Sequence, residues 1–121
     1  IIFTYDAIQP DITIEYPVDG ETYTCGELSE INGTAGDGET FVDRVYIRIE
    51  NGSTSLYWND SAWTTQPVDL ECSYADGNWS YRYVPKWEDD HIYIIHAFAE
   101  DAAGNVNYTM AQFKYSCPPL G

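Results

Sequence analysis

Five asparagines in this chain have the spacing of N-glycosylation acceptors. Each stands two residues before a Ser or Thr with no proline between them, which is the pattern that glycan transfer requires. Chance would place fewer than one of the six asparagines in this frame, so the pattern indicates a glycosylated extracellular protein; the alternative is that Asn-Gly and Asn-Asp turns simply precede polar residues. The five acceptors are Asn32, Asn51, Asn59, Asn78 and Asn107.

The sequence contains few of the residue patterns that are typical of catalytic sites. The two histidines, His91 and His96, have no metal-ligand spacing, and the chain contains neither a Gly-x-Ser-x-Gly elbow nor a glycine-rich phosphate loop. Acidic pairs such as Asp89-Asp90 are expected among twenty acidic residues and are typical of solvated turns. We therefore expect no catalytic residues and no enzyme activity.

Aromatic residues make up 16% of the chain and raise carbohydrate binding as an alternative. Trp58 and Trp63 flank the Asn59-Asp60 turn, where a pair of exposed rings could stack on sugar faces. The other interpretation is that the two rings pack on each other across a short hairpin or into the core.

The charge balance excludes some classes of binding partner. Twenty acidic and five basic residues give a formal net charge of -15, which repels nucleic acid and anionic lipid headgroups. Such a surface suits high salt, divalent cations or a cationic neighbour. No apolar run approaches 18 residues, so we expect neither membrane insertion nor a secretion signal, and the start at Ile1 suggests a processed or excised piece.

The elements that must position these residues are β-strands. Short segments rich in Val, Ile, Tyr, Trp and Thr alternate with Gly, Asp, Asn and Pro turns, and no window has a sustained helical period. Seven to nine antiparallel strands at this spacing predict an all-β sandwich of two sheets over residues 10–117. The expected strands are 11–16, 30–35, 42–50, 55–58, 62–65, 70–74, 79–84, 92–100 and 105–115.

The alternation of side chains along two of the expected strands predicts which residues face the core. Val45, Ile47 and Ile49 share one side of their strand and should face the core. In the strand near residues 92–100 both sides are bulky, so that Ile94 and Phe98 would lie on an outer face. Such apolar groups are candidate contacts with another subunit unless a loop or a sugar covers them.

The two ends of the chain resemble each other. Phe3-Thr4-Tyr5 followed by Pro10 parallels Phe113-Lys114-Tyr115 followed by Pro118, so residues 1–9 could be the tail of a preceding repeat and residues 118–121 a junction to the next unit. A chance match is the alternative, because Phe-x-Tyr is ordinary strand composition. The same segment could also pair with a neighbouring subunit as an added strand. Its candidate contact residues are Ile1, Ile2, Phe3 and Tyr5.

Five segments have a shared pattern: Ile31–Asp37, Val45–Ile49 with Asn51-Gly52, Trp58–Trp63, Gly77–Tyr81 and Ala99–Asn105. Together they resemble the prokaryotic Ig-like repeat domains of large bacterial and archaeal surface proteins. The resemblance spans residues 10 to 117 and implies an immunoglobulin-like sandwich, tandem repetition, an extracellular location and no catalysis. The three cysteines and the apolar Ile94 and Phe98 depart from the family pattern. The most specific piece is the turn Asp101–Asn105, which is similar to the turn before the last strand in that family.

A sandwich of this kind also suggests a calcium site and a disulfide. Turns at one end would bring together the oxygens of Asp37, Glu39, Asp101 and Asn105, as a hard cation requires, although these residues could equally bond their own turns. Three cysteines allow one internal disulfide and a leftover thiol, or a bond to another chain. The first and last strands end at the same pole, so we hypothesise a Cys25–Cys117 disulfide that leaves Cys72 buried or free.

These expectations combine into one function. The chain is expected to be a non-catalytic, N-glycosylated structural module at the cell surface, which needs no cofactor beyond N-linked glycans and possible Ca²⁺. Its expected partners are copies of itself or neighbouring Ig-like repeats, stacked end to end. The alternative is a carbohydrate-binding or adhesin module that uses the loops at one pole.

Overall fold

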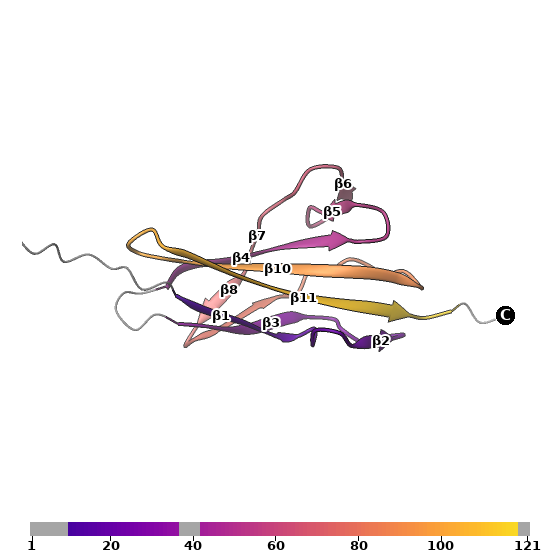
Figure 1. The fold of residues 1–121 in the computed structure, drawn as a ribbon, viewed down its shortest axis with the longest axis horizontal. Coiled ribbons are helices and arrows are strands. Elements are labelled where there is room, and N and C mark those ends of the chain that lie inside the picture. The colour runs from indigo at the N-terminus through magenta and orange to yellow at the C-terminus, as the bar shows by residue number, and fades with distance from the viewer. Residues whose placement is uncertain (1–9, 37–41, 119–121) are drawn as a thin grey trace, which may run out of the picture.

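The computed structural model describes residues 10–36 and 42–118, where every regular element is a β-strand. The strands form two sheets, shown in Figure 1. The smaller sheet has the order β1-β3-β9-β8, with β1 Asp11–Tyr16, β3 Ile31–Gly36, β9 Asn78–Tyr81 and β8 Ser73–Ala75. The larger has the order β2-β11-β10-β4-β5-β6, with β2 Thr22–Thr24, β11 Val106–Ser116, β10 His91–Asp101, β4 Val42–Asn51, β5 Leu56–Trp58 and β6 Trp63–Thr64; β7 Leu70–Glu71 also pairs with β4.

This strand order is that of an immunoglobulin-like sandwich, so the predicted fold class is confirmed. One sheet holds β1, β3, β9 and β8, and the other is built around β11, β10 and β4. The described pairs are antiparallel except one: β2 runs parallel to the end of β11, with Tyr23 opposite Tyr115.

Two local differences separate the observed strands from the expected ones. The expected strand 70–74 is divided, because the chain leaves the larger sheet after β7 and joins the smaller sheet at β8. The strand β2 was not expected, since it is only three residues long and pairs with a strand about ninety residues away. The described residues therefore form eleven strands where seven to nine were predicted for the chain.

The core lies between the sheets and follows the predicted alternation. Val45, Ile47 and Ile49 are almost completely buried, as are the inward positions of β10. Trp79 lies buried on the inner face of the smaller sheet, and its indole Nε1 donates a hydrogen bond to the carbonyl of Thr13 at 3.1 Å. The core is rich in aromatic rings toward one end, where Tyr93 stacks on Phe113 with 5.4 Å between ring centroids.

The described chain starts and finishes at opposite ends of the sandwich. The carbonyl of Pro10 accepts a hydrogen bond of 2.9 Å from Asn107 Nδ2, at the beginning of β11. Pro118 follows the other end of β11, which points away from that contact in Figure 1. We call the end that carries Pro10 the N-terminal pole and the end that carries Pro118 the disulfide pole.

Candidate functional site

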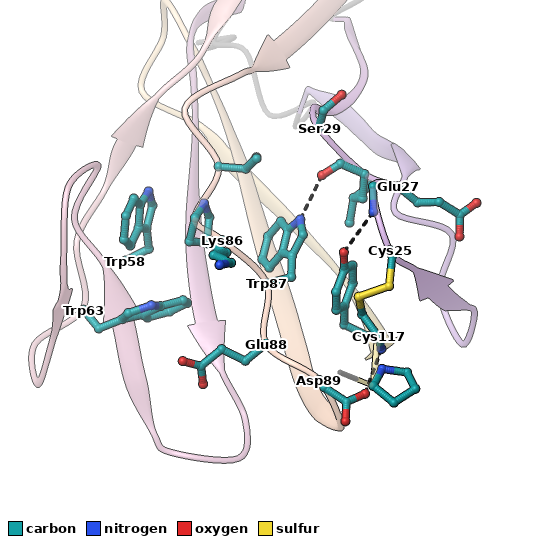
Figure 2. A pocket seen from close by; sticks show the side chains of 16 residues that line it. Cys25, Glu27, Ser29, Trp58, Trp63, Lys86, Trp87, Glu88, Asp89 and Cys117 are labelled. Carbon is teal, nitrogen blue, oxygen red and sulfur yellow. Dashed lines mark hydrogen bonds between the residues drawn. A yellow bond between two sulfur atoms is a disulfide. The ribbon is translucent and has the colours of Figure 1, made fainter. Parts of the chain in front are cut away.

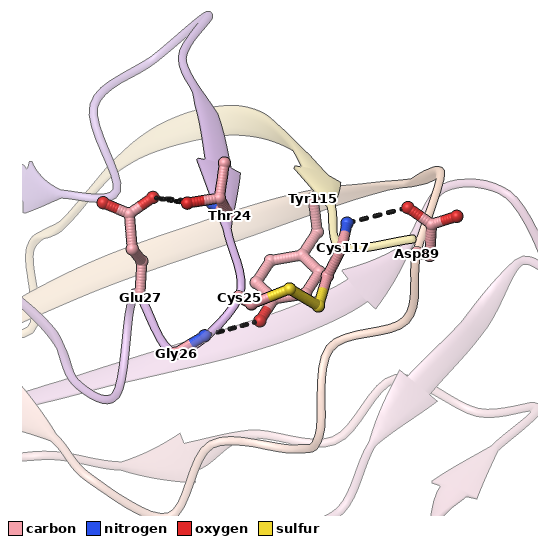
Figure 3. Close-up of a disulfide and its surroundings, with 7 residues drawn as sticks. All are labelled: Thr24, Cys25, Gly26, Glu27, Asp89, Tyr115 and Cys117. Atoms are coloured by element: carbon pink, nitrogen blue, oxygen red, sulfur yellow. Dashed lines mark hydrogen bonds between the residues drawn. A yellow bond between two sulfur atoms is a disulfide. The ribbon is translucent and has the colours of Figure 1, made fainter. Parts of the chain in front are cut away.

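The disulfide pole is named for the bond between Cys25 and Cys117. This is the pairing hypothesised from the sandwich topology; it joins the loop after β2 to the residue after β11 across 92 positions of sequence, with 4.9 Å between the Cα atoms. Neighbouring hydrogen bonds fix the same region, because the Gly26 amide donates to the Tyr115 hydroxyl at 3.2 Å and the Cys117 amide donates to Asp89 Oδ1 at 2.7 Å (Figure 3). The last strand is therefore tied to the start of the domain.

A connection between β9 and β10 forms the middle of this pole. Trp87 inserts its ring into the core, edge-on to Tyr93 at 4.8 Å and to Phe113 at 5.1 Å. Its indole Nε1 donates to the carbonyl of Leu28 at 2.8 Å. Because Trp87 is anchored in this way, the preceding Lys86 is held at the surface of the pole.

The β5–β6 hairpin forms the opposite wall. Trp58 and Trp63 are cross-strand partners, with ring centroids 5.5 Å apart and planes tilted by 59°. Asn59 Oδ1 accepts hydrogen bonds from the amides of Ser61 and Ala62, which stabilises the turn between them. Trp58 Nε1 donates to the Tyr83 carbonyl at 2.9 Å, and this bond attaches the hairpin to the chain that leads to Trp87.

Between these walls lies a groove of about 1220 Å³, which we call the disulfide-pole groove (Figure 2). Trp58 and Trp63 stand on one side and the disulfide on the other, with Lys86 and Trp87 between them. The residues that line it are Cys25, Gly26, Glu27, Leu28, Ser29, Trp58, Trp63, Val84, Pro85, Lys86, Trp87, Glu88, Asp89, Tyr115, Cys117 and Pro118.

The charged groups of the groove differ in how they are used. Hydrogen bonds from the amide and hydroxyl of Thr24 lower the pKa of Glu27. Asp89 accepts from the Cys117 amide, and Glu88 lies 3.4 Å from His91. Lys86 is the one Lys or Arg of the described residues without an ion pair, since the other four are paired with carboxylates. The groove combines apolar walls with one unpaired ammonium group, that of Lys86, and three carboxylates, those of Glu27, Glu88 and Asp89.

The calcium expectation is wrong for the part of the chain that the structure describes. Asp101 and Asn105 instead stabilise the β10–β11 turn, because Asp101 Oδ1 accepts from the amides of Ala103 and Asn105 while Asn105 Nδ2 donates to Asp101 Oδ2 at 3.0 Å. Within residues 10–36 and 42–118 no three His, Cys, Asp or Glu side chains gather as metal ligands. The other two expected ligands, Asp37 and Glu39, lie outside the described residues.

The expected N-linked glycans are contradicted most clearly at Asn51. Its side chain is only 3% exposed, its Nδ2 lies 2.9 Å from His91 Nδ1, and its Oδ1 accepts from the amides of Ser53 and Thr54. A glycan on this nitrogen would displace the contact with His91 and would need space beside a side chain that is almost completely buried. Of the other acceptors, Asn32 and Asn107 are half-buried and donate to Glu30 and Pro10.

The remaining two acceptors are also used locally. Asn78 is exposed, with Nδ2 3.2 Å from the Asp76 carbonyl, and Asn59 holds its own hairpin turn. Neither the structure nor the comparisons with known proteins support glycans at any of the five positions, so the alternative interpretation as turn residues accounts for Asn51 and Asn59.

The candidate subunit contacts on β10, Ile94 and Phe98, lie on the outer face of the larger sheet. Phe98 faces outward from the larger sheet, as expected, but its ring is stacked on Tyr46 at 4.9 Å and lies 5.0 Å from the Tyr108 ring. Ile94 is half-buried on the same outer face. The other candidates, Ile1, Ile2, Phe3 and Tyr5, lie outside the described residues.

Cys72 is the one free cysteine. It lies between β7 and β8, where the chain crosses from one sheet to the other, and packs against the core. Burial raises the pKa of its thiol to about 12. The thiol is therefore protonated at neutral pH and is a poor nucleophile.

Sequence reasoning found only part of the groove. Trp58 and Trp63 were identified from their positions around a turn, whereas Lys86, Trp87 and Leu28 were missed. They come from connections rather than strands, and Trp87 contacts Leu28 across 59 positions of sequence. The available clue was a lone tryptophan in the polar run Lys86–Asp90, which indicates an anchor into a core.

Comparison with known proteins supports the fold and leaves the family open. No family model matches the chain, and no curated protein matches it. Among solved structures, CopC from Methylosinus trichosporium OB3b is similar, with a TM-score of 0.62 over 93% of this chain and 99% of that chain. The two sequences are 8% identical, so the likeness shows a shared β-sandwich fold.

The search for membrane-spanning helices gave no candidate. Within residues 10–36 and 42–118, no helix has the length and apolar character needed to cross a bilayer.

Proposed function

We propose that this chain is a non-catalytic structural module that works outside the cytoplasm and joins like units end to end. It serves either as a repeat of a longer surface protein or as a filament subunit. The observation that carries the proposal is the placement of Pro10 and Pro118 at opposite poles. The eleven residues of β11 separate them by about 36 Å at roughly 3.3 Å per residue, so successive units would extend in a line.

The disulfide supports a role under tension. Force applied to the chain after Cys117 passes directly to Cys25, so β11 cannot be peeled from β10 starting at that end. The parallel β2–β11 pairing beside it adds hydrogen bonds that would have to break together. Disulfides persist in oxidising surroundings, which agrees with a location outside the cytoplasm.

The resemblance to prokaryotic Ig-like surface repeats agrees with the same function. That resemblance covers residues 10 to 117, which is nearly the whole sandwich. Two units that each carry a net charge of -15 repel each other. Joining therefore has to depend on a specific contact that outweighs this repulsion. The proposed role does not depend on glycans or on a metal ion.

The test of this function is whether the full chain associates in a line. Sedimentation velocity over a concentration series should show a growing set of species rather than a single dimer, because a head-to-tail contact does not close. Negative-stain electron microscopy of the same samples should show single-file rods. A chain that stays monomeric at every concentration and ionic strength would contradict the filament subunit and leave only a repeat of a longer protein.

A second candidate function is carbohydrate binding, and the disulfide-pole groove favours it. Trp58 and Trp63 line the groove together with carboxylates that could accept hydroxyl protons. Retention of the full chain on insoluble polysaccharides tests this directly. Trp63→Ala should abolish retention, while Met110→Ala, an exposed position on the outer face of β11, should leave it unchanged.

A further inference from the structure

The disulfide-pole groove has the character of a docking site for a peptide segment. Its volume of about 1220 Å³ is above the roughly 300–1,000 Å³ that pockets for small ligands occupy. Its walls are mostly apolar side chains and the disulfide, including Leu28, Val84 and Trp63. An apolar surface of this size is a candidate site of contact with protein.

The tryptophans of the groove are poorly arranged to stack on a sugar. Trp58 and Trp63 are tilted by 59° and do not form a flat platform. Trp63 also stacks against Tyr93, with centroids 6.0 Å apart, and Trp87 is only 7% exposed because its ring belongs to the core. These irregular apolar walls suit branched and aromatic side chains better than a planar sugar face.

The chain itself contains a segment of matching chemistry. Residues 1–9, which precede the N-terminal pole, begin with the apolar run Ile1-Ile2-Phe3-Thr4-Tyr5. The one charged residue of this segment is Asp6, which is opposite in sign to the unpaired Lys86; because Glu27, Glu88 and Asp89 also line the groove, the match is mainly between apolar side chains, with Lys86 as the single group that favours Asp6. Every other Lys and Arg of the described residues already has a carboxylate partner.

The length of the segment decides between its own groove and a neighbour's. If residues 1–5 occupied a groove, only residues 6–9 would remain to connect them to Pro10, and four extended residues span at most about 14 Å. The groove of the same molecule lies at the far end of β11, about 36 Å away at roughly 3.3 Å per residue. The segment therefore cannot reach its own groove, but it can reach the groove of a second copy placed in line.

We propose that the disulfide-pole groove binds residues 1–5 of a second copy of this chain, with Lys86 facing Asp6. This inference rests on the proposed end-to-end function and names the contact that would produce it. Because each copy offers a segment at one pole and a groove at the other, the interaction is heterologous and extends without closing.

Two complementary full-chain variants test this contact. The double variant Ile2→Asp, Phe3→Asp has an altered segment and an intact groove, whereas Trp63→Ala has an intact segment and an altered groove. Each variant alone should associate at least about tenfold more weakly than the wild type in sedimentation velocity. Mixing the two should restore one joint for each pair of molecules, so heterodimers form but longer species do not.

Two further variants serve as controls. Met110→Ala removes an exposed side chain far from the groove and should associate as the wild type does. Circular dichroism establishes whether Trp63→Ala is folded; if it is not, Lys86→Glu replaces it, since Lys86 is exposed and outside the core.

The outcomes separate this inference from the function it rests on. If the Ile2→Asp, Phe3→Asp variant associates as strongly as the wild type, or if the mixture of the two variants forms no heterodimers, the docking proposal is overturned. End-to-end joining would still stand in either case. A wild type that never associates overturns both the docking proposal and the filament-subunit form of the proposed function. A groove that retains polysaccharide, with no effect of the segment variant on association, overturns the docking proposal in favour of carbohydrate binding.

Discussion

The disulfide should contribute more to stability than any other single bond in the domain. Cys25 and Cys117 are 92 positions apart, so the bond closes a loop that includes nearly the whole sandwich. The chain-entropy relation for a loop of this length gives about 16 cal/mol/K, or about 4.6 kcal/mol at 25 °C, by which the bond restricts the unfolded state. Replacing both cysteines by alanine should lower the free energy of unfolding by that amount.

The corresponding change in melting temperature is large for a protein of this size. An unfolding entropy of about 2.1 cal/mol/K per residue gives about 250 cal/mol/K for 121 residues, so the loss of 4.6 kcal/mol lowers the midpoint by about 18 °C. Urea unfolding and thermal scans of the double variant, with and without reductant, measure both quantities. Reductant should destabilise the wild type and leave the double variant unchanged.

Cys72→Ala is the matched control, because it removes a cysteine that forms no disulfide. Its unfolding should respond to reductant as the wild type does. A loss below about 1 kcal/mol in the double variant would refute the reasoning, since it would mean that the bond closes no long loop in the unfolded chain.

Three further predictions concern single features of the fold. Asp101→Ala should lower the free energy of unfolding by about 3 kcal/mol, because the turn between β10 and β11 loses a buried carboxylate that accepts hydrogen bonds from two backbone amides. An unchanged midpoint in urea unfolding would show that the turn does not need this carboxylate. The raised pKa of Cys72 predicts that its thiol resists iodoacetamide at pH 8 in the native state and reacts on unfolding. It also predicts a loss of stability as pH rises from about 9 toward 12, where the unfolded thiol ionises and the folded one does not; rapid native alkylation would contradict both statements. Self-association should strengthen from low to high salt, because screening reduces repulsion between units of charge -15, and weaker association at high salt would indicate a contact dominated by ion pairs.

The fold was predictable because alternation along single strands is a local property. Val45, Ile47 and Ile49 face the core as their spacing requires, and the same holds for the inward positions of β10. The missed strand β2 shows the limit, because its three residues become a strand only by pairing with β11. Pairing of this kind depends on contacts that no local window contains.

The candidate site was less predictable for a related reason. A sequon identifies Asn51 as a glycan acceptor, but its burial against His91 depends on the packing of β4 beside β10. Asp101 and Asn105 have the chemistry of cation ligands, yet the turn uses their oxygens for its own amides. The groove needs the β5–β6 hairpin, the Trp87 connection and the disulfide loop together, and these are distant in sequence.

The most direct measurement is electron microscopy of the full wild-type chain at high concentration and high salt, with the Ile2→Asp, Phe3→Asp variant beside it. End-to-end joining predicts single-file rods with a repeat on the order of 40 Å, the length of one sandwich along β11 with its turns, and shorter or no rods for the variant. Isolated particles in the wild type under all conditions would contradict the proposed joining of separate chains as filament subunits.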